Sequence, residues 1–384
     1  MGMSLPLEGV RILDLSTVGF GPYASQIMAE QGADVIKVEA PEGDSTRYTG
    51  PARSHGMAAM YLGLNRNKRS VVLDLTTEAG RAAFRDLVRS ADVVMHNIRT
   101  QKLAKLGLDY ATLKAVKDDI VYAALKGFRD DGPYGGRPAY DDIIQGMCGI
   151  ADLNDRMIGE PRYVPMFMVD KTCGLFAAQA ITAAIAGRAR TGRGCTVDVP
   201  MFETMVSFVM TEHWYGRHFD PAPDGYGYVR VLAPWRRPFR TADGHICCMP
   251  YTDAHWRRLW AERGREDLAA DPRFRTMKDR TGNIGVLYES LQGELEKETT
   301  AYWLACTERL EIPAGPVTRL QDVEHDPHLN GIGFFKMLDH PSEGPLAMPG
   351  VAIRFDGVEP PVGPPPLLGE HTGEILGALQ DGRP

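Results

Sequence analysis

The sequence predicts an α/β protein: a parallel, doubly wound sheet followed by a smaller α+β domain. Over about the first 125 residues, short apolar runs typical of strands alternate with stretches typical of helices, which is the pattern of a parallel sheet with crossover helices. Near residue 220 the composition shifts to Pro, Gly, Arg and aromatic residues in "DPAPDGYGYVRVLAPWRRPFR". This shift marks a crossover into a second part of the chain.

The elements of the first part follow from the length and period of the apolar runs. Predicted strands cover 9–16, 33–40, 70–76, 91–98 and 120–128. Predicted helices cover 21–32, 78–90, 109–117, 140–153 and 170–191, and a strand followed by a helix covers 195–210. Pro22 suits the start of the first helix and Gly32 its end.

The second part contains a hairpin, helices and an extended tail. "FRTADGHICCMPY" offers turn chemistry between two strand-like pieces, while 253–264 and 283–312 are helical in pattern. The tail 358–379 is Pro-rich and extended and ends in a short helix. We therefore expect a large domain over 1–215, a small domain over 225–325, and a C-terminal segment over 326–384 that returns to the large domain.

Composition and charge exclude several classes of function. The 384 residues are 43% hydrophobic and 24% charged, with a net charge of −7, so nothing suggests a nucleic-acid surface. No apolar run reaches the roughly 18–20 residues of a membrane span, and "MGMSLPLEGVRILDLS" lacks the pattern of a signal peptide. We expect a cytoplasmic protein that binds neither nucleic acid nor membrane.

The turn after the first strand has the spacing of a dinucleotide-binding motif. Gly19, Gly21 and Ala24 fit G-x-G-x-x-[G/A], and Glu39 closes the second strand, where such motifs place the acid that binds a ribose hydroxyl. Three interpretations stay open from this motif: NAD binding, a tight turn that needs glycine for packing, and another nucleotide-bearing ligand at the same positive helix end.

Basic residues gather beside two strands. Arg66, Lys68 and Arg69 precede one strand, whereas Arg99, Lys102 and Lys105 follow another. Ligands of open α/β sheets bind at the carboxyl ends of strands, so the second cluster is better placed for phosphates. The alternative for both clusters is a solvated charged face.

Metal and serine-hydrolase chemistry lack their sequence signals. His96, His213 and His245 are isolated, and neither HxxxH nor HExxH occurs. The six cysteines show no CxxC spacing and are expected to be reduced thiols. There is no G-x-S-x-G motif either. We expect no metal site.

Asp170 is the acid that most needs an explanation. It lies in "PMFMVDKTCGLFAAQAITAAIAG", between an apolar run and a long Ala-rich segment, and an unpaired buried carboxylate costs several kcal/mol. One interpretation is a helix N-cap. The other is a nucleophile that attacks an activated carbonyl to form an anhydride. Tyr140, Asp141 and Asp142 form a second polar group at the start of a predicted helix.

Together these segments resemble the family III CoA-transferases, the CaiB/BaiF type, a superfamily that includes formyl-CoA transferase, carnitine CoA-transferase and the α-methylacyl-CoA racemases. The resemblance covers most of the chain and is carried by "PLEGVRILDLSTVGFGPYASQIMAEQGADVIKVEAPEGDSTR", "NRNKRSVVLDL", "HNIRTQKLAKLGLDY", "KGFRDDGPYGGRPAYDDIIQGMCGI", "VDKTCGL", "RTGRGCTVDVPMFE" and "PPPLLGEHTGEIL". It implies a Rossmann-like domain that binds CoA instead of NAD, and an interlocked, ring-like homodimer.

The resemblance also implies roles for individual residues. Asp170 matches the nucleophile that carries acyl groups as a mixed anhydride and CoA as a thioester. Tyr140 and Asp141 match supporting positions of the active site. Positions that match the family's CoA-binding positions are Val18, Phe20, Ala40, Leu73, Thr76, Asn97, Ile98, Arg99, Lys105, Arg137 and Tyr140.

Two other functions remain as alternatives. A racemase would remove the proton α to a thioester and needs two bases, but the racemase branch has His where this chain has Tyr140, and a tyrosine with a pKa of about 10 is a poor base. A non-catalytic CoA-binding protein would have no need of Asp170. The resemblance therefore favours an acyl-CoA:carboxylate CoA-transferase.

The acyl substrate is less well defined. The second domain lacks the glycine run of formyl-CoA transferase, where this chain reads "VLAPWRRPFRTADGH". Arg230, Arg236 and Arg237 lie nearby and would suit a second carboxylate, although a domain-linker surface explains them equally well. A dicarboxylate such as succinate is thus a hypothesis, and the sequence names neither the donor nor the acceptor.

Overall fold

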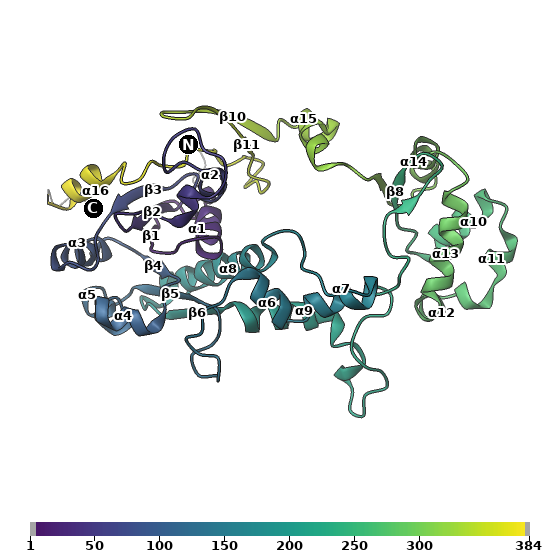
Figure 1. Ribbon diagram of the computed structural model, residues 1–384, viewed down its shortest axis with the longest axis horizontal. Helices are drawn as coiled ribbons and strands as arrows, with labels where there is room; N and C mark the ends of the chain where they lie inside the picture. The colour runs from purple at the N-terminus through teal and green to yellow at the C-terminus, as the bar shows by residue number, and fades with distance from the viewer. Residues whose placement is uncertain (1–4, 381–384) are drawn as a thin grey trace. The chain divides into compact units, whose positions relative to one another are not determined.

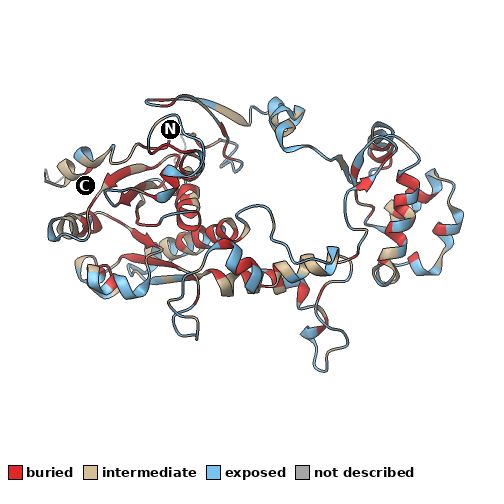
Figure 2. Ribbon diagram, viewed as in Figure 1, coloured by how far each residue is buried: buried red, intermediate tan, exposed pale blue. Residues whose placement is uncertain are grey.

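The computed structural model describes residues 5–380, which form two compact units (Figure 1). The first is formed by the described parts of Met1–Cys148, Tyr163–Phe208 and Pro327–Pro384. The second consists of Gly149–Arg162 and Val209–Asp326. Each unit has its own buried core (Figure 2).

The first unit is built on a six-stranded parallel sheet in the order β3-β2-β1-β4-β5-β6. Its strands are β1 (Arg11–Asp14), β2 (Asp34–Glu39), β3 (Arg69–Val72), β4 (Val93–His96), β5 (Val121–Lys126) and β6 (Thr196–Pro200). The predicted parallel, doubly wound sheet is confirmed. Because β1 and β4 are neighbours, the strand order reverses between them, which is where such folds bind ligands.

Helices cover both faces of this sheet (Figure 1), so most residues of β1 to β5 are buried. One face carries α1 (Phe20–Glu30) and α8 (Met168–Thr191). The other carries α3 (Glu78–Arg89), α4 (Thr100–Leu106), α5 (Tyr110–Val116) and α16 (Thr372–Gln380), whose buried residues pack with alternate strand residues such as Leu13 and Ile36.

The two helices α1 and α8 pack very closely. A Cβ on Gly174 of α8 would lie 2.9 Å from Tyr23 Cδ1 and 3.1 Å from the carbonyl oxygen of Phe20. Only glycine fits at this distance. The close approach brings the second turn of α8 against the first turn of α1.

The C-terminal segment lies on the first unit beside β3 (Figure 1). The backbone N–H of His371 donates to Ser70 O, and the N–H of Gly369 donates to Ser70 Oγ. The C-terminal segment also contains the antiparallel hairpin of β10 (Phe335–His340) and β11 (Gly344–Pro349). The remaining helices of this unit are α2 (Ala59–Leu64), α6 (Asp141–Met147) and α15 (Pro327–Gly331), and α9 (Met201–His213) begins in it.

The second unit combines a small antiparallel sheet with helices. The strands β7 (Phe239–Arg240), β8 (His245–Cys248) and β9 (Ala314–Pro316) form the sheet, which confirms the predicted hairpin. The helices are α7 (Ile150–Ile158), α10 (Asp253–Glu262), α11 (Glu266–Ala270), α12 (Met277–Gly282), α13 (Ile284–Leu295) and α14 (Thr300–Arg309). Trp260 and Trp303 lie in the core of this unit.

Two of the predicted helices were wrong in detail. The single helix expected over 140–153 is two helices, α6 and α7, because Gly149 has a φ of 98° and ends the first one. The run 283–312 is likewise divided, since Thr299 caps the new helix α14. Helix α4 was missed because its seven residues, "TQKLAKL", carry too short a pattern.

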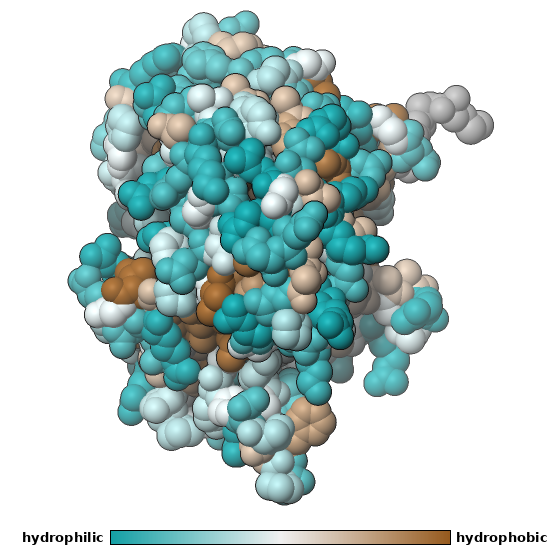
Figure 3. Space-filling model, turned by 90° about the vertical axis from the view of Figure 1, so that its right-hand side faces the viewer, coloured by the Kyte–Doolittle hydropathy of each residue, from teal (hydrophilic) through white to brown (hydrophobic). Residues whose placement is uncertain are grey.

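The face drawn in Figure 3 is mainly hydrophilic, and its apolar side chains gather in a few small patches. No helix within residues 5–380 is long and apolar enough to cross a membrane.

Candidate active site

A pocket lies at the carboxyl ends of β1, β4 and β5, where the strand order of the sheet reverses. Its volume is about 220 Å³, and all of its lining residues belong to the first unit. The structure brings together eight of the residues predicted for the site. They are Val18, Phe20, Asn97, Ile98, Arg99, Arg137, Tyr140 and Asp170.

Five of the other predicted residues do not line this pocket. Ala40 is exposed after β2, and Thr76 is exposed and donates through Oγ1 to Asp74. Leu73 is buried in the sheet core, so its side chain is already used in packing. Lys105 is exposed in the last turn of α4. Asp141 is buried, and its Oδ2 accepts the backbone N–H of Asp170.

Asp170 is held in the first turn of α8. The cap of this helix is Phe167, so the interpretation of Asp170 as an N-cap is wrong. Its backbone N–H donates to Asp141 Oδ2 over 2.9 Å. Its own carboxylate accepts no hydrogen bond from any residue that the structure describes, although the residue is only 9% exposed. The carboxylate therefore lies at the pocket without a hydrogen-bond donor in the part of the chain that the structure describes.

Gly19 makes room for this carboxylate. A Cβ on Gly19 would lie 2.3 Å from Asp170 Oδ2, far below any real contact distance. Gly19, the first glycine of the apparent dinucleotide motif, is thus needed because any side chain there would collide with the Asp170 carboxylate. Gly21 is required for packing, since a Cβ there would lie 2.1 Å from Ser16 Oγ.

The environment of Asp170 raises its pKa to about 7. Burial is the main cause because it removes water from the charged form, and the negative charge of Asp141 adds to it. A carboxylate with few solvating partners is a stronger nucleophile than one in water. Such perturbed acids in pockets are typical of functional sites.

Gln145 fixes the position of Asp141. The Gln145 Nε2 atom donates to Asp141 Oδ1 over 2.6 Å, and Gln145 Oε1 accepts the backbone N–H of Val164 over 2.9 Å. Gln145 is fully buried. It therefore ties helix α6 to the segment that leads into α8. Sequence reasoning missed it, because its role depends on contacts between separate segments.

Three cations lie at the pocket. Arg99 and Arg137 were expected there from the resemblance, whereas Lys126 was not. Lys126 pairs with Asp130 at 2.7 Å and with Asp198 at 2.8 Å. Its position as the last residue of β5 was the signal that could have identified it. The charge of Lys126 is thus balanced by two acids, whereas the two arginines suit a ligand that carries negative groups.

The other basic residues near strand ends have structural roles. Arg66 pairs with Glu30 at 2.7 Å, and the buried Lys68 donates to Asn65 Oδ1 and to the carbonyl oxygen of Pro22. They stabilise the fold and do not line the pocket.

Glu39 cannot act as the ribose-binding acid of a dinucleotide site. Its carboxylate is 4% exposed and accepts bonds from Arg47 Nε, Arg47 Nη2, Ser70 Oγ and the N–H of Asp44. All of its acceptor capacity is used inside the protein. Within residues 5–380, no group of three or more His, Cys, Asp or Glu side chains could hold a metal ion.

Comparisons with known proteins identify the family. The family model described as CoA-transferase family III matches residues 7–372. The chain is 33% identical to the succinate–glutarate CoA-transferase of Agrobacterium fabrum, covering 98% of this chain and 96% of the relative. It is 34% identical to the succinyl-CoA:mesaconate CoA-transferase of Haloarcula marismortui, covering 96% and 95%.

A solved structure is similar over the whole chain. The crystal structure of a CaiB/BaiF family protein from Brucella suis has a TM-score of 0.81 and 33% sequence identity, covering 98% of this chain and 100% of that one. The resemblance read from the sequence is therefore confirmed. The chain belongs to CoA-transferase family III, and is a CoA-transferase that uses acyl-CoA as a substrate.

Proposed function

We propose that this enzyme transfers CoA from an acyl-CoA donor to a carboxylic acid, with Asp170 as the nucleophile. The observation that carries the proposal is the state of the Asp170 carboxylate: it lies at the pocket wall, nearly buried, without a hydrogen-bond donor among the described residues. Burying such a carboxylate without a partner costs free energy of folding, and a role in catalysis would explain why the protein keeps it.

The reaction proceeds in four steps at this carboxylate. Asp170 attacks the donor thioester carbonyl, the C–S bond breaks, and a mixed anhydride and the CoA thiolate form. The thiolate then attacks the Asp170 carbonyl of the anhydride, which releases the donor acid and gives an aspartyl-CoA thioester. An acceptor carboxylate attacks this thioester to form a second anhydride and again free the thiolate. The thiolate finally attacks the acceptor acyl carbon, which gives the new acyl-CoA and restores Asp170.

Residues of the pocket fit the CoA part of the substrate. Arg99 and Arg137 supply positive charge for its phosphates, and the start of α1 adds the positive end of a helix dipole. Val18, Phe20 and Ile98 offer apolar surface at the same pocket. Ala40, Leu73, Thr76 and Lys105 are retained as proposed CoA-binding positions from the family resemblance alone.

We propose a dicarboxylate as acceptor or as donor acid. Both transferases named above act on dicarboxylic acids by name: succinate with glutarate, and succinyl-CoA with mesaconate. Arg236 and Arg237 are exposed in the second unit, and Arg230 is half buried and donates to Tyr288 Oη. An Arg236→Ala enzyme with unchanged dicarboxylate turnover would remove this arginine from the proposal.

We also propose the interlocked homodimer of the family. The exposed apolar residues Tyr163, Met166 and Phe167, just before α8, are the kind of surface that a second chain covers. Sedimentation should give twice the chain mass, and a monomer would contradict the proposal.

Intact-protein mass spectrometry with hydroxylamine tests the nucleophile. After incubation with succinyl-CoA, hydroxylamine should convert an Asp170 anhydride or thioester to a hydroxamate about 15 Da heavier. The adduct should map to Asp170 and be absent from Asp170→Asn. Asp142→Asn, which changes an exposed acid next to Asp141, is the matched control and should keep the adduct.

A racemase would give a different result. It would form no adduct with any acyl-CoA tested, and it would exchange the α-proton of the acyl group in deuterated water. Exchange without an adduct would overturn the transferase mechanism.

A further inference from the structure

The turn between β1 and α1, formed by Ser16, Thr17, Val18 and Gly19, has an unusual backbone. Val18 has a φ of 71°, in the left-handed region. A β-branched side chain is strained there, at a cost on the order of a few kcal/mol. Such a conformation persists only where the surrounding structure holds it. Val18 and Gly19 both line the pocket, and Gly19 lies against the Asp170 carboxylate.

Side chains from two directions hold the first half of this turn. The Asn97 side chain clamps Thr17: its Oδ1 accepts the Thr17 N–H over 3.1 Å and its Nδ2 donates to Thr17 O over 2.8 Å. The Ser16 N–H donates to Asp14 Oδ1 over 2.8 Å. Both polar atoms of the Asn97 side-chain amide bond the backbone of Thr17. Asn97 therefore shapes the pocket by holding the turn.

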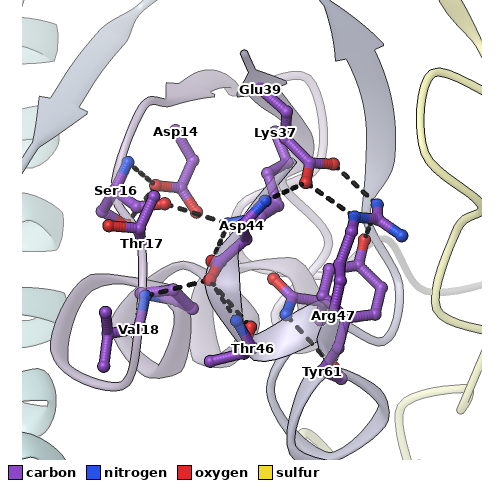
Figure 4. Close-up of polar contacts among 12 residues, drawn as sticks. Asp14, Ser16, Thr17, Val18, Lys37, Glu39, Asp44, Thr46, Arg47 and Tyr61 are labelled. Atoms are coloured by element: carbon purple, nitrogen blue, oxygen red, sulfur yellow. Dashed lines mark hydrogen bonds and ion pairs between the residues drawn. The ribbon is translucent and has the colours of Figure 1, made fainter. Parts of the chain in front are cut away.

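The strained residue itself is held by Asp44. Asp44 Oδ1 accepts the Val18 N–H over 3.3 Å, and Asp44 Oδ2 pairs with Lys37 Nζ at 2.9 Å (Figure 4). Lys37 Nζ also donates to the carbonyl oxygen of Ser16 over 2.9 Å. The Lys37–Asp44 ion pair thus bonds both ends of the stretch from Ser16 to Val18, which precedes Gly19.

This ion pair has a cost that fold stability alone does not explain. The side chains of Lys37 and Asp44 are 1% and 0% exposed. A buried pair is often no more stabilising than apolar residues of the same size. Its directed bonds to the turn are what an apolar pair could not supply. Asp44 also caps a short 3₁₀ helix through the Thr46 N–H, so any test must separate that role from the role at the turn.

We propose that Asp44 is a positioning residue for the nucleophile: it holds Val18 in the left-handed conformation and thereby keeps Gly19 against the Asp170 carboxylate. The inference rests on the proposed role of Asp170. Without this acceptor, Val18 relaxes toward negative φ, and the Val18–Gly19 peptide rotates at the pocket wall. The geometry in which Asp170 meets the thioester is then lost, although Asp44 never touches the substrate.

The test is a double-mutant cycle between Asp44→Ala and Val18→Gly. Glycine adopts a φ of 71° without strain, so the Val18→Gly enzyme has no need of the clamp. The measured quantity is the single-turnover rate constant of hydroxamate formation at Asp170. The amplitude of that reaction reports the fraction of folded enzyme, and its rate constant reports the geometry of the site.

We expect Asp44→Ala to slow this rate constant by about tenfold, equivalent to roughly 1.4 kcal/mol. We expect Val18→Gly in the same chain to restore most of the loss. Glu294→Gln is the control: it removes a buried charge of the second unit, whose partners Arg263, Arg265 and Lys297 bond no atom of the turn. Its effect should be the same with and without Val18→Gly.

The outcomes separate the inference from the proposed function. An unchanged rate constant in Asp44→Ala, or a loss that Val18→Gly does not restore, overturns the positioning role. No Asp170 adduct in the wild-type enzyme overturns the proposed function, and the inference with it. If Asp44→Ala does not fold, Asp44→Asn takes its place. It keeps Oδ1 but accepts more weakly, so a loss of about threefold that Val18→Gly restores is then expected.

Discussion

In the first unit, the environment of the Asp170 carboxylate is the opposite of that of three other buried carboxylates. Asp44, Asp14 and Glu39 belong to an ion-pair cluster with Lys37, Arg47 and Lys68, and their oxygens accept bonds from cations, hydroxyls and backbone N–H groups. Asp170 is nearly as buried but has no such partner among the described residues.

The pKa values follow this difference. Burial alone would raise the pKa of Asp44, but Lys37 and the Thr46 N–H hold it below its usual range. At Asp170 burial and the charge of Asp141 act in the same direction, and the pKa rises to about 7. The comparison teaches that the paired acids are fixed by their partners, whereas the unpaired acid is the one that we propose to be reactive.

The largest predicted effect concerns the unpaired acid. Asp170→Asn should lower kcat for CoA transfer by about a thousandfold or more, because an amide cannot form the covalent intermediate. A steady-state assay with succinyl-CoA and glutarate measures this. Retention of most activity would show that the unpaired carboxylate is not the nucleophile.

Removing a cation from the ion-pair cluster should instead lower the stability of the fold. Lys37→Met leaves Asp44 buried without its cation, which should lower the free energy of unfolding by about 3–5 kcal/mol. Urea denaturation measures the change. Arg89→Met removes an exposed ion pair, in which the two side chains are 66% and 60% exposed, and should cost less than about 1 kcal/mol. Equal losses for the two variants would contradict this contrast.

The unpaired acid should destabilise the fold at high pH. A carboxyl whose folded pKa is raised contributes stability below its unfolded pKa and loses it as the pH rises through about 7. Asp170→Asn should therefore stabilise the enzyme at pH 8, by about 4 kcal/mol at most, since one pKa unit is about 1.4 kcal/mol. At pH 5 the gain should be much smaller. Denaturation of both proteins at the two pH values checks the sign.

Gly19 ends the turn that the paired acids hold and lies against the unpaired Asp170. Its substitution is expected to have a smaller effect. In Gly19→Ala the new Cβ would meet Asp170 Oδ2 at 2.3 Å, so the carboxylate must move. A displacement of about 1 Å at a reacting group can cost about a hundredfold in rate. We expect a loss of that order in kcat, with folding retained. Gly282→Ala, at a glycine in the second unit with open space around it, is the control and should be active.

Much of this site could be predicted from the sequence, and the failures have physical reasons. The sequence predicts the strands and points to Asp170, because a run of apolar residues and a single acid among apolar neighbours are both local patterns. The sequence left the role of Gly19 open, because its spacing fits a dinucleotide motif as well as a tight turn, and the contact with Asp170 of α8 is visible only in the fold.

Other features depend on contacts that no local pattern carries. Val18 gives no sign of a left-handed backbone, since β-branched residues rarely adopt it. Gln145 and Asp44 read as ordinary polar residues until the fold brings their partners from distant segments.

The pH dependence of Asp170 labelling tests the central claim most directly. The rate of hydroxamate formation at Asp170 should be measured by mass spectrometry from pH 5 to pH 9, at constant hydroxylamine free base. We predict a rate that rises with pH, with a midpoint near 7, because only the ionised carboxylate attacks the thioester. A label at another residue, or a rate at Asp170 that is flat above pH 5, would contradict the account of an unpaired, reactive acid.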